Sequence, residues 1–290
     1  MAESFETYRP YLFSIAYRML SSAMDAEDVV QETYLRYQDR VAQPEGIISL
    51  KAFLTTILTR LCMDQLHLAR RQRETYLGPW LPEPIGDSSA LEVVDPEERV
   101  DREESVSLAF LVLLEELQPV ERAVFLLREV FEYEYAEIAS FLGRSEIACR
   151  QAFSRAKKHL AERRPRFQAS PETHRQLLTG FLQAVQVGDM DTLMSLLSDD
   201  VTLYADGGGK VKGAATRPIS GSSAVARFAI GTRQRFLPER YRIELASVNR
   251  QPAIVIRGDE RAYLVLTIEV EADRIRTVRI VANPEKLARV

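Results

Sequence analysis

The sequence has few of the residues that cross-link, anchor or export a protein. Only two of its 290 residues are cysteines, Cys62 and Cys149, and both fall in segments with helical periodicity, so we expect no disulfide framework. The longest uninterrupted apolar run, 108–114, is seven residues long, whereas a membrane-spanning helix needs about 20. Residues 1–6 show no basic stretch leading into an apolar one, so we expect no export signal. These absences favour a soluble cytoplasmic protein with no membrane partner.

Charge, by contrast, is plentiful and unevenly distributed, although the formal net charge is only −4. Residues 87–104 hold eight acidic against two basic residues, and residues 144–166 hold eight basic against two acidic residues. A basic block in an acidic chain favours local binding to nucleic acid. A solvated helix face is the alternative explanation of the same block.

The apolar pattern predicts a multidomain protein with two helical domains and one mixed domain. Residues 1–75 and 105–166 have helical periodicity. Residues 76–104 are expected to be a linker, because glycine and proline interrupt regular structure before the acidic stretch. Residues 171–290 begin with a helical stretch and continue as short β-branched runs between turn signals, which predicts an α+β domain built on an antiparallel sheet. The expected strands are 201–204, 241–245, 253–256, 263–270 and 275–281.

A helix-turn-helix is predicted within residues 136–160. Gly143 can adopt the left-handed turn that ends the first helix, and Ser145 can cap the second. The expected buried face of the second helix consists of Cys149, Phe153, Ala156 and Leu160. The candidate DNA-contacting residues on and before its polar face are Arg144, Ser145, Arg150, Gln151, Ser154, Arg155 and Lys158. Arginine and glutamine can read base edges in a major groove, and further basic residues suit phosphates. A plain helical hairpin is the alternative.

The order of these parts resembles the sigma factors of the extracytoplasmic-function (ECF) group. The resemblance rests on the acidic helical stretch 25–34, the linker and the helix-turn-helix. It implies that the helical domains are sigma regions 2 and 4, and that the chain directs core RNA polymerase to the −10 and −35 elements of promoter DNA. In this family an acidic helix binds the clamp helices of the polymerase β′ subunit, and the β flap is a further expected partner. The matching clamp-binding positions here are Asp25, Glu27, Asp28, Gln31 and Glu32. For the first two, complementing the helix dipole is the alternative role.

Region 2 of this family also ends in a helix that meets the −10 element. The corresponding stretch here is 53–71, and the candidate DNA-binding residues are Arg60, Asp64, His67, Arg70 and Arg71. Such a helix holds an unstacked base in a pocket and the single strand on a basic surface. The sequence departs from the family where arginines usually follow the aspartate, because Gln65 and His67 stand there instead.

Three further strings narrow the resemblance to the subgroup that carries a C-terminal SnoaL-like domain of the NTF2-like cone fold. They are Trp80-Leu81-Pro82-Glu83-Pro84, Asp206-Gly207-Gly208-Gly209-Lys210 and Asn283-Pro284-Glu285-Lys286-Leu287. The resemblance covers essentially the whole chain, and it implies that this domain regulates the sigma domains in place of a separate anti-sigma factor. We expect Trp80 to anchor a stiff strap between the domains, and the three glycines to form a mobile loop at an interdomain contact.

Two other functions fit part of the sequence. An NTF2-like enzyme would need an aspartate or histidine as general base inside the cone. The candidates are His174, Asp189, Asp191, Asp199, Asp200 and Asp206. They form no convincing pair at strand positions, so we expect no catalysis, no cofactor and no metal. A ligand-sensing repressor with a helix-turn-helix leaves the first seventy residues unexplained, and only the sigma-factor hypothesis requires binding to core polymerase.

Overall fold

The computed structural model describes residues 4–41, 49–86, 106–161, 170–232, 240–259 and 261–290. These residues form two compact units, which are described separately. The helical unit comprises the described residues within 4–74, residue 106 and residues 110–161. The C-terminal unit comprises residues 75–86, 107–109 and the described residues from 170 onward. No helix in the described part of the chain is long and apolar enough to cross a membrane. The acidic stretch 87–104 and the basic residues Arg163, Arg164 and Arg166 lie outside the described residues.

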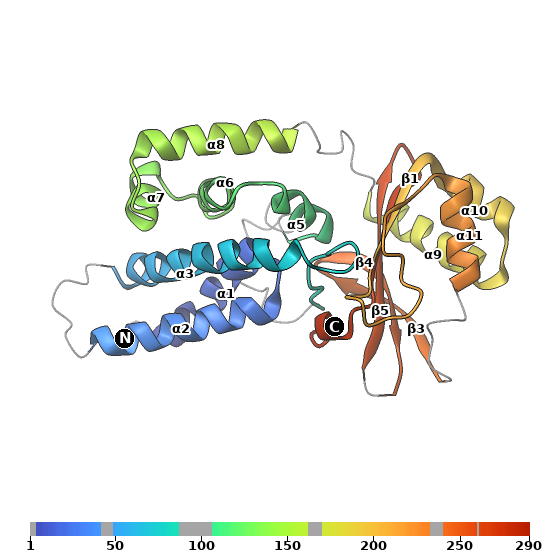
Figure 1. Cartoon of the computed structure of the whole chain (residues 1–290), viewed down its shortest axis with the longest axis horizontal. Helices are drawn as coiled ribbons and strands as arrows, with labels where there is room; N and C mark the ends of the chain where they lie inside the picture. Colours follow the sequence, from blue (N-terminus) through green and yellow to red (C-terminus); the bar gives the residue numbers. More distant parts are fainter. Residues whose placement is uncertain (1–3, 42–48, 87–105, 162–169, 233–239, 260) are drawn as a thin grey trace. The chain divides into compact units, whose positions relative to one another are not determined.

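Three long helices form the first half of the helical unit: α1 (Phe5–Leu20), α2 (Ala23–Val41) and α3 (Leu50–Arg73) (Figure 1). Helix α1 is the centre of this bundle, because every residue from Tyr11 to Leu20 is buried. It ends at Ser21, which adopts a left-handed conformation (φ 55°) and lets the chain turn directly into α2. Helix α3 buries a stripe with helical spacing, namely Leu54, Leu58, Cys62 and Leu66. The opposite side of α3 is exposed.

The second half of the helical unit consists of short helices: α5 (Leu108–Glu115), α6 (Pro119–Phe125), the π-helical turn η3 (Leu126–Val130), α7 (Tyr135–Leu142) and α8 (Glu146–Ala161). Pro119 lies in the first turn of α6, and Gln118 and Glu121 form a capping box at the start of this helix. Gly143 ends α7 in the left-handed region (φ 62°). The Oγ of Ser145 accepts a hydrogen bond from the backbone of Ala148 (3.2 Å) and caps α8. The predicted helix-turn-helix is therefore present.

The C-terminal unit is built on one six-stranded sheet with the order β2-β1-β6-β5-β4-β3 (Figure 1). The strands are β1 (Leu197–Asp206), β2 (Ile219–Ser220), β3 (Arg242–Val248), β4 (Gln251–Arg257), β5 (Ala262–Glu271) and β6 (Arg274–Val281). The sheet is not wholly antiparallel as expected, because β1 pairs with β6 in parallel. A period-2 pattern identifies a strand but not its neighbour, and the long connection from β1 to β6 permits a parallel pair.

Three helices of this unit lie on one face of the sheet: α9 (Pro171–Val187), α10 (Met190–Leu196) and α11 (Ser222–Thr232). Their apolar sides and alternate residues of β1, β4, β5 and β6 form one core, which includes Phe181, Val225, Leu203, Ile254 and Val278. The short 3₁₀ helix η4 (Pro284–Lys286) follows β6. The C-terminal unit is therefore an α+β domain, with helices packed on one face of a sheet, as predicted.

Candidate functional sites

The outer face of α8 and the turn before it present all seven residues predicted to contact DNA through the helix-turn-helix. Arg144, Ser145, Arg150, Gln151, Ser154, Arg155 and Lys158 are each exposed. The opposite face buries Cys149, Ala152, Ala156 and Leu160. Phe153 was expected in that buried stripe, but it is only partly buried, because it lies at the edge of the stripe and stacks on Phe125 with 6.1 Å between ring centroids. The helix therefore keeps a polar side free for a partner.

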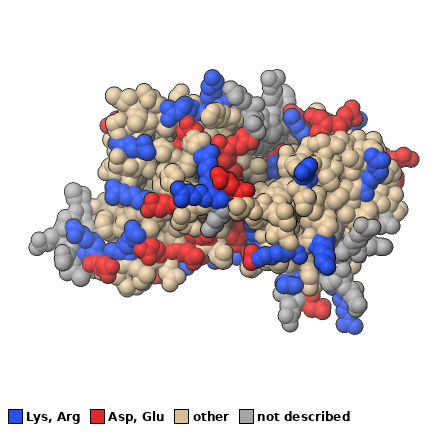
Figure 2. Space-filling view, viewed as in Figure 1, with Lys and Arg blue, Asp and Glu red and all other residues tan. Residues whose placement is uncertain are grey.

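Several α8 cations have acidic or aromatic neighbours within the helical unit. Arg150 pairs with Glu146 one turn earlier (2.9 Å), and its guanidinium also lies 4.6 Å from the Tyr135 ring centroid. Arg155 pairs with Glu121 of α6 (2.7 Å). On the face of the molecule that Figure 2 shows, basic and acidic side chains are interspersed over the helical unit and form no continuous basic surface. Part of the positive charge of α8 is thus neutralised within the helical unit.

The exposed side of α3 brings together the residues predicted to meet the −10 element. Arg60, Asp64, His67 and Arg71 are spaced four, three and four residues apart, so they share one face, and Arg70 lies beside them. Two of the arginines contact the second half of the helical unit. The Nε of Arg60 donates to the carbonyl of Phe141 (3.1 Å), and Arg70 donates to the side chain of Gln118 (2.5 Å).

The acidic residues of α2 are not equally available to a partner. Asp25 is partly buried and accepts a hydrogen bond from Gln65 of α3 (3.4 Å). Glu27 pairs with Arg9 of α1 (2.6 Å). Glu32 pairs with Arg36 of its own helix (2.8 Å). Asp28 and Gln31 are exposed, and they are the most accessible of the five predicted positions.

A buried polar joint links the two halves of the helical unit. The hydroxyl of Tyr133, which is 7% exposed, lies 2.6 Å from the hydroxyl of Tyr11 on α1 and 3.2 Å from the hydroxyl of Thr55 on α3. The Tyr133 ring packs edge-on against Phe141 at a centroid distance of 4.9 Å. The ammonium of Lys51 lies 4.5 Å from the centre of the Tyr11 ring. We call these contacts of Tyr133 with Tyr11 and Thr55 the tyrosine joint.

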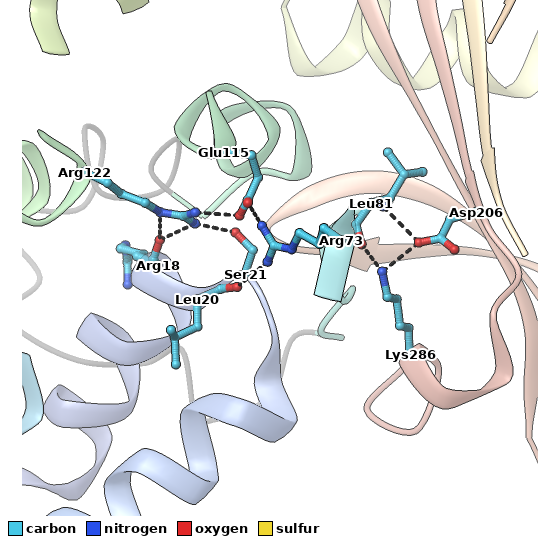
Figure 3. Close-up of polar contacts among 9 residues, drawn as sticks. All are labelled: Arg18, Leu20, Ser21, Arg73, Leu81, Glu115, Arg122, Asp206 and Lys286. Atoms are coloured by element: carbon cyan, nitrogen blue, oxygen red, sulfur yellow. Dashed lines mark hydrogen bonds and ion pairs between the residues drawn. The ribbon is translucent and has the colours of Figure 1, made fainter. Parts of the chain in front are cut away.

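A buried arginine forms a second polar contact between the two halves of the helical unit (Figure 3). Arg122 of α6 is 1% exposed and donates to the carbonyl of Arg18 (2.9 Å) and to the Oγ of Ser21 (2.6 Å). Its guanidinium also pairs with Glu115 (2.5 Å), whose second carboxylate oxygen pairs with Arg73 at the end of α3. Burial lowers the pKa of Arg122, but the acceptors around it favour the charged form, as expected for a guanidinium. Sequence patterning gave no sign of this cluster, because an arginine on a short helix is ordinarily exposed.

The three strings that narrowed the resemblance meet within the C-terminal unit, around the fully buried carboxylate of Asp206 (Figure 3). One carboxylate oxygen accepts hydrogen bonds from the backbone of Leu81 (2.9 Å) and from the Nζ of Lys286 (2.7 Å). The other accepts from the hydroxyl of Tyr76 (2.5 Å), which accepts in turn from the side-chain amide of Asn283 (3.0 Å). Burial and the hydrogen bond to Asp206 raise the pKa of Tyr76, so the phenol remains a donor. We call this group the Asp206 anchor.

The segment from Tyr76 to Gly86, which we call the strap, is held on the C-terminal unit along its length. The ring of Trp80 is partly buried, and the Lys286 ammonium lies 4.1 Å from its centre. Further along, Ile85 exchanges backbone and side-chain hydrogen bonds with Asn249, and Gly86 forms an isolated bridge with Val248. The described part of the expected linker thus packs as part of this unit. Sequence analysis missed Tyr76, which lies four residues before the tryptophan that marks the string.

The three glycines form a packed turn and not the mobile loop that we expected. A Cβ on Gly207 would lie 2.6 Å from that of Ala214, and one on Gly208 would overlap the Asn283 side chain. Gly208 (φ 58°) and Gly209 (φ 69°) also have left-handed backbones. The string therefore needs glycine for close approach as well as for backbone conformation.

The candidate general bases of the enzyme hypothesis do not converge on the cavity of the C-terminal unit. This cavity, about 330 Å³ in volume, lies between α9, α11 and the inner face of the sheet. None of the described residues that line it is an aspartate, glutamate or histidine. Asp189 caps α10, and Asp206 faces the strap. The described residues contain no cluster of three acidic, histidine or cysteine side chains suited to a metal ion.

Comparison with known proteins identifies the family. Residues 4–74 match Sigma-70 region 2, and residues 107–160 match Sigma-70, region 4. The chain is 36% identical to the ECF RNA polymerase sigma factor SigJ of Mycobacterium tuberculosis, over 97% of this chain and 91% of that protein. It belongs to the ECF RNA polymerase sigma factors. A probable ECF sigma factor of the same organism, SigI, is 31% identical over 99% of this chain and 94% of its own length. The crystal structure of SigJ superposes with a TM-score of 0.73 at 34% identity, covering 97% of this chain and 96% of that one.

Membership of this family identifies the sigma regions within the helical unit and confirms the predicted function as a sigma factor. The helical unit of this ECF sigma factor contains region 2 in α1–α3 and region 4 in the helices that follow. Its partners are core RNA polymerase and promoter DNA, and it directs the polymerase to the promoter. Sigma factors are not enzymes. The similarity to SigJ extends through the C-terminal unit. Region 2 and region 4 are in direct contact here through the tyrosine joint and the Arg122 cluster.

Proposed function

We propose that this sigma factor binds the β′ clamp helices of core polymerase through α2, the −10 element through α3, and the −35 element and the β flap through region 4. The assigned residues are those predicted above on each helix. The exposed polar face of α8, opposite a fully buried stripe, carries the proposal. Arg150 and Gln151 are exposed near the start of that helix, where recognition helices read base edges. The protein acts in the cytoplasm, where core polymerase works.

The test of the α8 assignment is promoter opening by reconstituted holoenzyme on a promoter selected with the wild-type protein. Arg150→Ala and Gln151→Ala should each cost about 1–3 kcal/mol at the −35 element, which is the usual value of a base contact. Lys158→Ala should instead weaken binding to all sequences alike, because it is assigned to a phosphate. Arg227→Ala, an exposed arginine on α11, is the matched control. Wild-type activity of both Arg150→Ala and Gln151→Ala would show that α8 does not read the promoter.

Productive binding also requires the two regions to separate. The −10 and −35 elements lie ~25 base pairs apart, which is about 80 Å of B-DNA at roughly 34 Å per turn. In the helical unit Tyr133 of region 4 is within 2.6 Å of Tyr11 of region 2. Arg60 and Arg70, which we assign to the −10 element, donate here to Phe141 and Gln118 of the other half. We infer that the described helical unit is the resting form and opens on core polymerase.

The C-terminal unit is proposed to regulate this sigma factor from within the chain, in place of a separate anti-sigma factor. In sequence, only Glu74 and Thr75 separate the last residue of α3 from Tyr76 of the strap. Seating of the strap on the Asp206 anchor therefore restrains the chain directly after the helix assigned to the −10 element. A tether of this kind makes even a modest contact effective, because the local concentration is high.

Truncation after Arg166 and substitution of Trp80 test this regulation in reconstituted transcription. The truncated chain and Trp80→Ala should both differ from wild type in transcript yield. Trp80→Phe keeps a ring under the Lys286 ammonium and should lie closer to wild type than Trp80→Ala. Equal yields from full-length and truncated protein at several promoters would show that the C-terminal unit is not a regulator.

A further inference from the structure

The cavity of the C-terminal unit has the form of a binding site for a small molecule. Its volume, about 330 Å³, is roughly twice the ~150 Å³ of an engineered apolar cavity that binds benzene, and lies within the range of natural ligand sites. The walls are aliphatic and aromatic side chains from three directions, such as Phe181 of α9, Phe228 of α11, and Ile254 and Leu266 of the sheet. A native core is ordinarily packed without voids of this size.

The lining also indicates the chemistry of the occupant. No acidic residue, lysine, arginine or histidine is among the described residues of the wall, so against this part of the wall a charged ligand would lose its hydration without a counter-charge. The polar lining side chains, Gln186, Thr232 and Tyr241, are exposed or partly exposed, whereas Ala205 and Ile254 are buried. A fitting ligand is therefore uncharged, larger than a single benzene ring, and apolar at its buried end, with one or two hydrogen-bonding groups toward the open end.

The wall of this cavity is shared with the Asp206 anchor. Alternation along β1 directs Ala205 into the cavity and the next side chain, that of Asp206, toward the strap. The end of β6 repeats the pattern, since Ala282 lines the cavity and the side chain of Asn283 bonds to Tyr76. The backbone amides of Ala282 and Asn283 both donate to the carbonyl of Asp206 (2.8 and 2.9 Å). These bonds connect the end of β1 to the end of β6.

The glycine turn completes this connection. Val211 and Ala214 line the cavity, and both lie so close to Gly207 that a Cβ there would meet them at 3.3 and 2.6 Å. On the other side of the turn, Gly208 packs on Asn283. Because Gly207 and Gly208 approach both the cavity wall and Asn283 this closely, we expect a displacement of this part of the wall to move the groups that hold the strap.

We propose that the C-terminal unit binds an uncharged, largely apolar small molecule in this cavity, and that binding favours the seated strap. The cavity is present in the structure in which the strap is seated, and the two share the ends of β1 and β6, so a ligand that fits this cavity should stabilise the seated state. Reciprocity requires that weakening the anchor also weakens ligand binding. The second part of the proposal deepens the proposed regulation by the C-terminal unit, whereas binding itself does not depend on it.

A matched pair of dyes tests the ligand chemistry on the full-length chain, without polymerase or DNA. N-phenyl-1-naphthylamine is neutral, and 1-anilinonaphthalene-8-sulfonate has the same ring skeleton with an added sulfonate. The neutral dye should bind saturably at one site, with at least about tenfold higher affinity than the sulfonate. Ala229→Phe and Ile254→Phe should each reduce this affinity by about tenfold or more by filling the cavity. Arg227→Ala on the exposed side of α11 is the control.

Circular dichroism and thermal unfolding show whether Ala229→Phe and Ile254→Phe fold. The two substitutions are on different walls of the cavity, so the test can still be made if one of the two variants does not fold. Equal affinity for both dyes, or undiminished binding to a folded filled variant, would overturn the ligand site.

The only tryptophan of the chain, Trp80, lies on the strap and reports the coupling. Its emission should change as the neutral dye saturates the cavity. Lys286→Met removes the bonds to Leu81 and Asp206, and should weaken dye binding by about fivefold or more. Dye binding that is unaffected by Lys286→Met, with constant Trp80 emission, would overturn the coupling but leave the ligand site standing. Neither result depends on transcription, so failure of the proposed regulation is distinguished from failure of this inference.

Discussion

Removal of one hydroxyl group from the tyrosine joint should make the helical unit easier to open. Tyr133→Phe deletes the contacts with Tyr11 (2.6 Å) and Thr55 (3.2 Å) and leaves the ring on Phe141. A buried hydrogen bond contributes about 1 kcal/mol net, and buried partners left unsatisfied add to the cost, so the joint should weaken by about 1–2 kcal/mol. That corresponds to a roughly 5- to 30-fold larger open population.

Affinity for core polymerase is the quantity that this change should move. If only the open form binds, and the closed form dominates in free protein, the apparent dissociation constant falls by the same factor as the open population rises. The assay is a titration of labelled core polymerase with wild-type and Tyr133→Phe protein, accompanied by urea unfolding of each. Tyr135→Phe is the matched control, because the Tyr135 ring packs on Phe153 and Arg150, both in region 4.

The outcome separates opening from simple destabilisation. Opening predicts that Tyr133→Phe is less stable than wild type and binds polymerase more tightly. Lower stability with unchanged or weaker polymerase binding would refute the reasoning that the described contact is a resting form.

Three further results are expected. Arg122→Met should lower the free energy of unfolding of the helical unit by about 3 kcal/mol in urea titrations, because the carbonyl of Arg18 and the hydroxyl of Ser21 lose their buried donor; no change would show that the cluster is not stabilising. Asp28→Arg should weaken polymerase binding more than Asp39→Arg, which carries the same charge change further along α2; equal losses would point to net charge alone. Burial lowers the pKa of His174, whose Nε2 has no hydrogen-bond partner among the described residues, so the unfolded chain binds the proton first as pH falls through about 6.5. Thermal stability of the C-terminal unit should therefore decline below that pH and do so less in His174→Met; identical pH profiles would contradict this.

Local chemistry alone determined much of the helical unit. The predicted helix-turn-helix followed from Gly143, which reaches a left-handed backbone most easily, and from Ser145, whose side chain satisfies a free amide at a helix start. Period-3.6 and period-2 patterns likewise located α8 and five of the six described strands of the C-terminal unit, because burying one side of an element requires that pattern; the two-residue strand β2 is too short to show one. The exposed faces of α3 and α8 could be predicted for the same reason.

Only the tertiary structure decided what those faces and strings contact. Tyr76 and Asn283 are 207 positions apart, and Leu81 and Asp206 are 125 apart, so no local pattern could show that they share one anchor. The burial of Arg122, the parallel pairing of β1 with β6, and the packed glycine turn follow likewise from partners distant in the chain. The sequence around a side chain fixes its backbone conformation and the face on which it lies. Its contact partners depend instead on how distant parts of the chain are brought together.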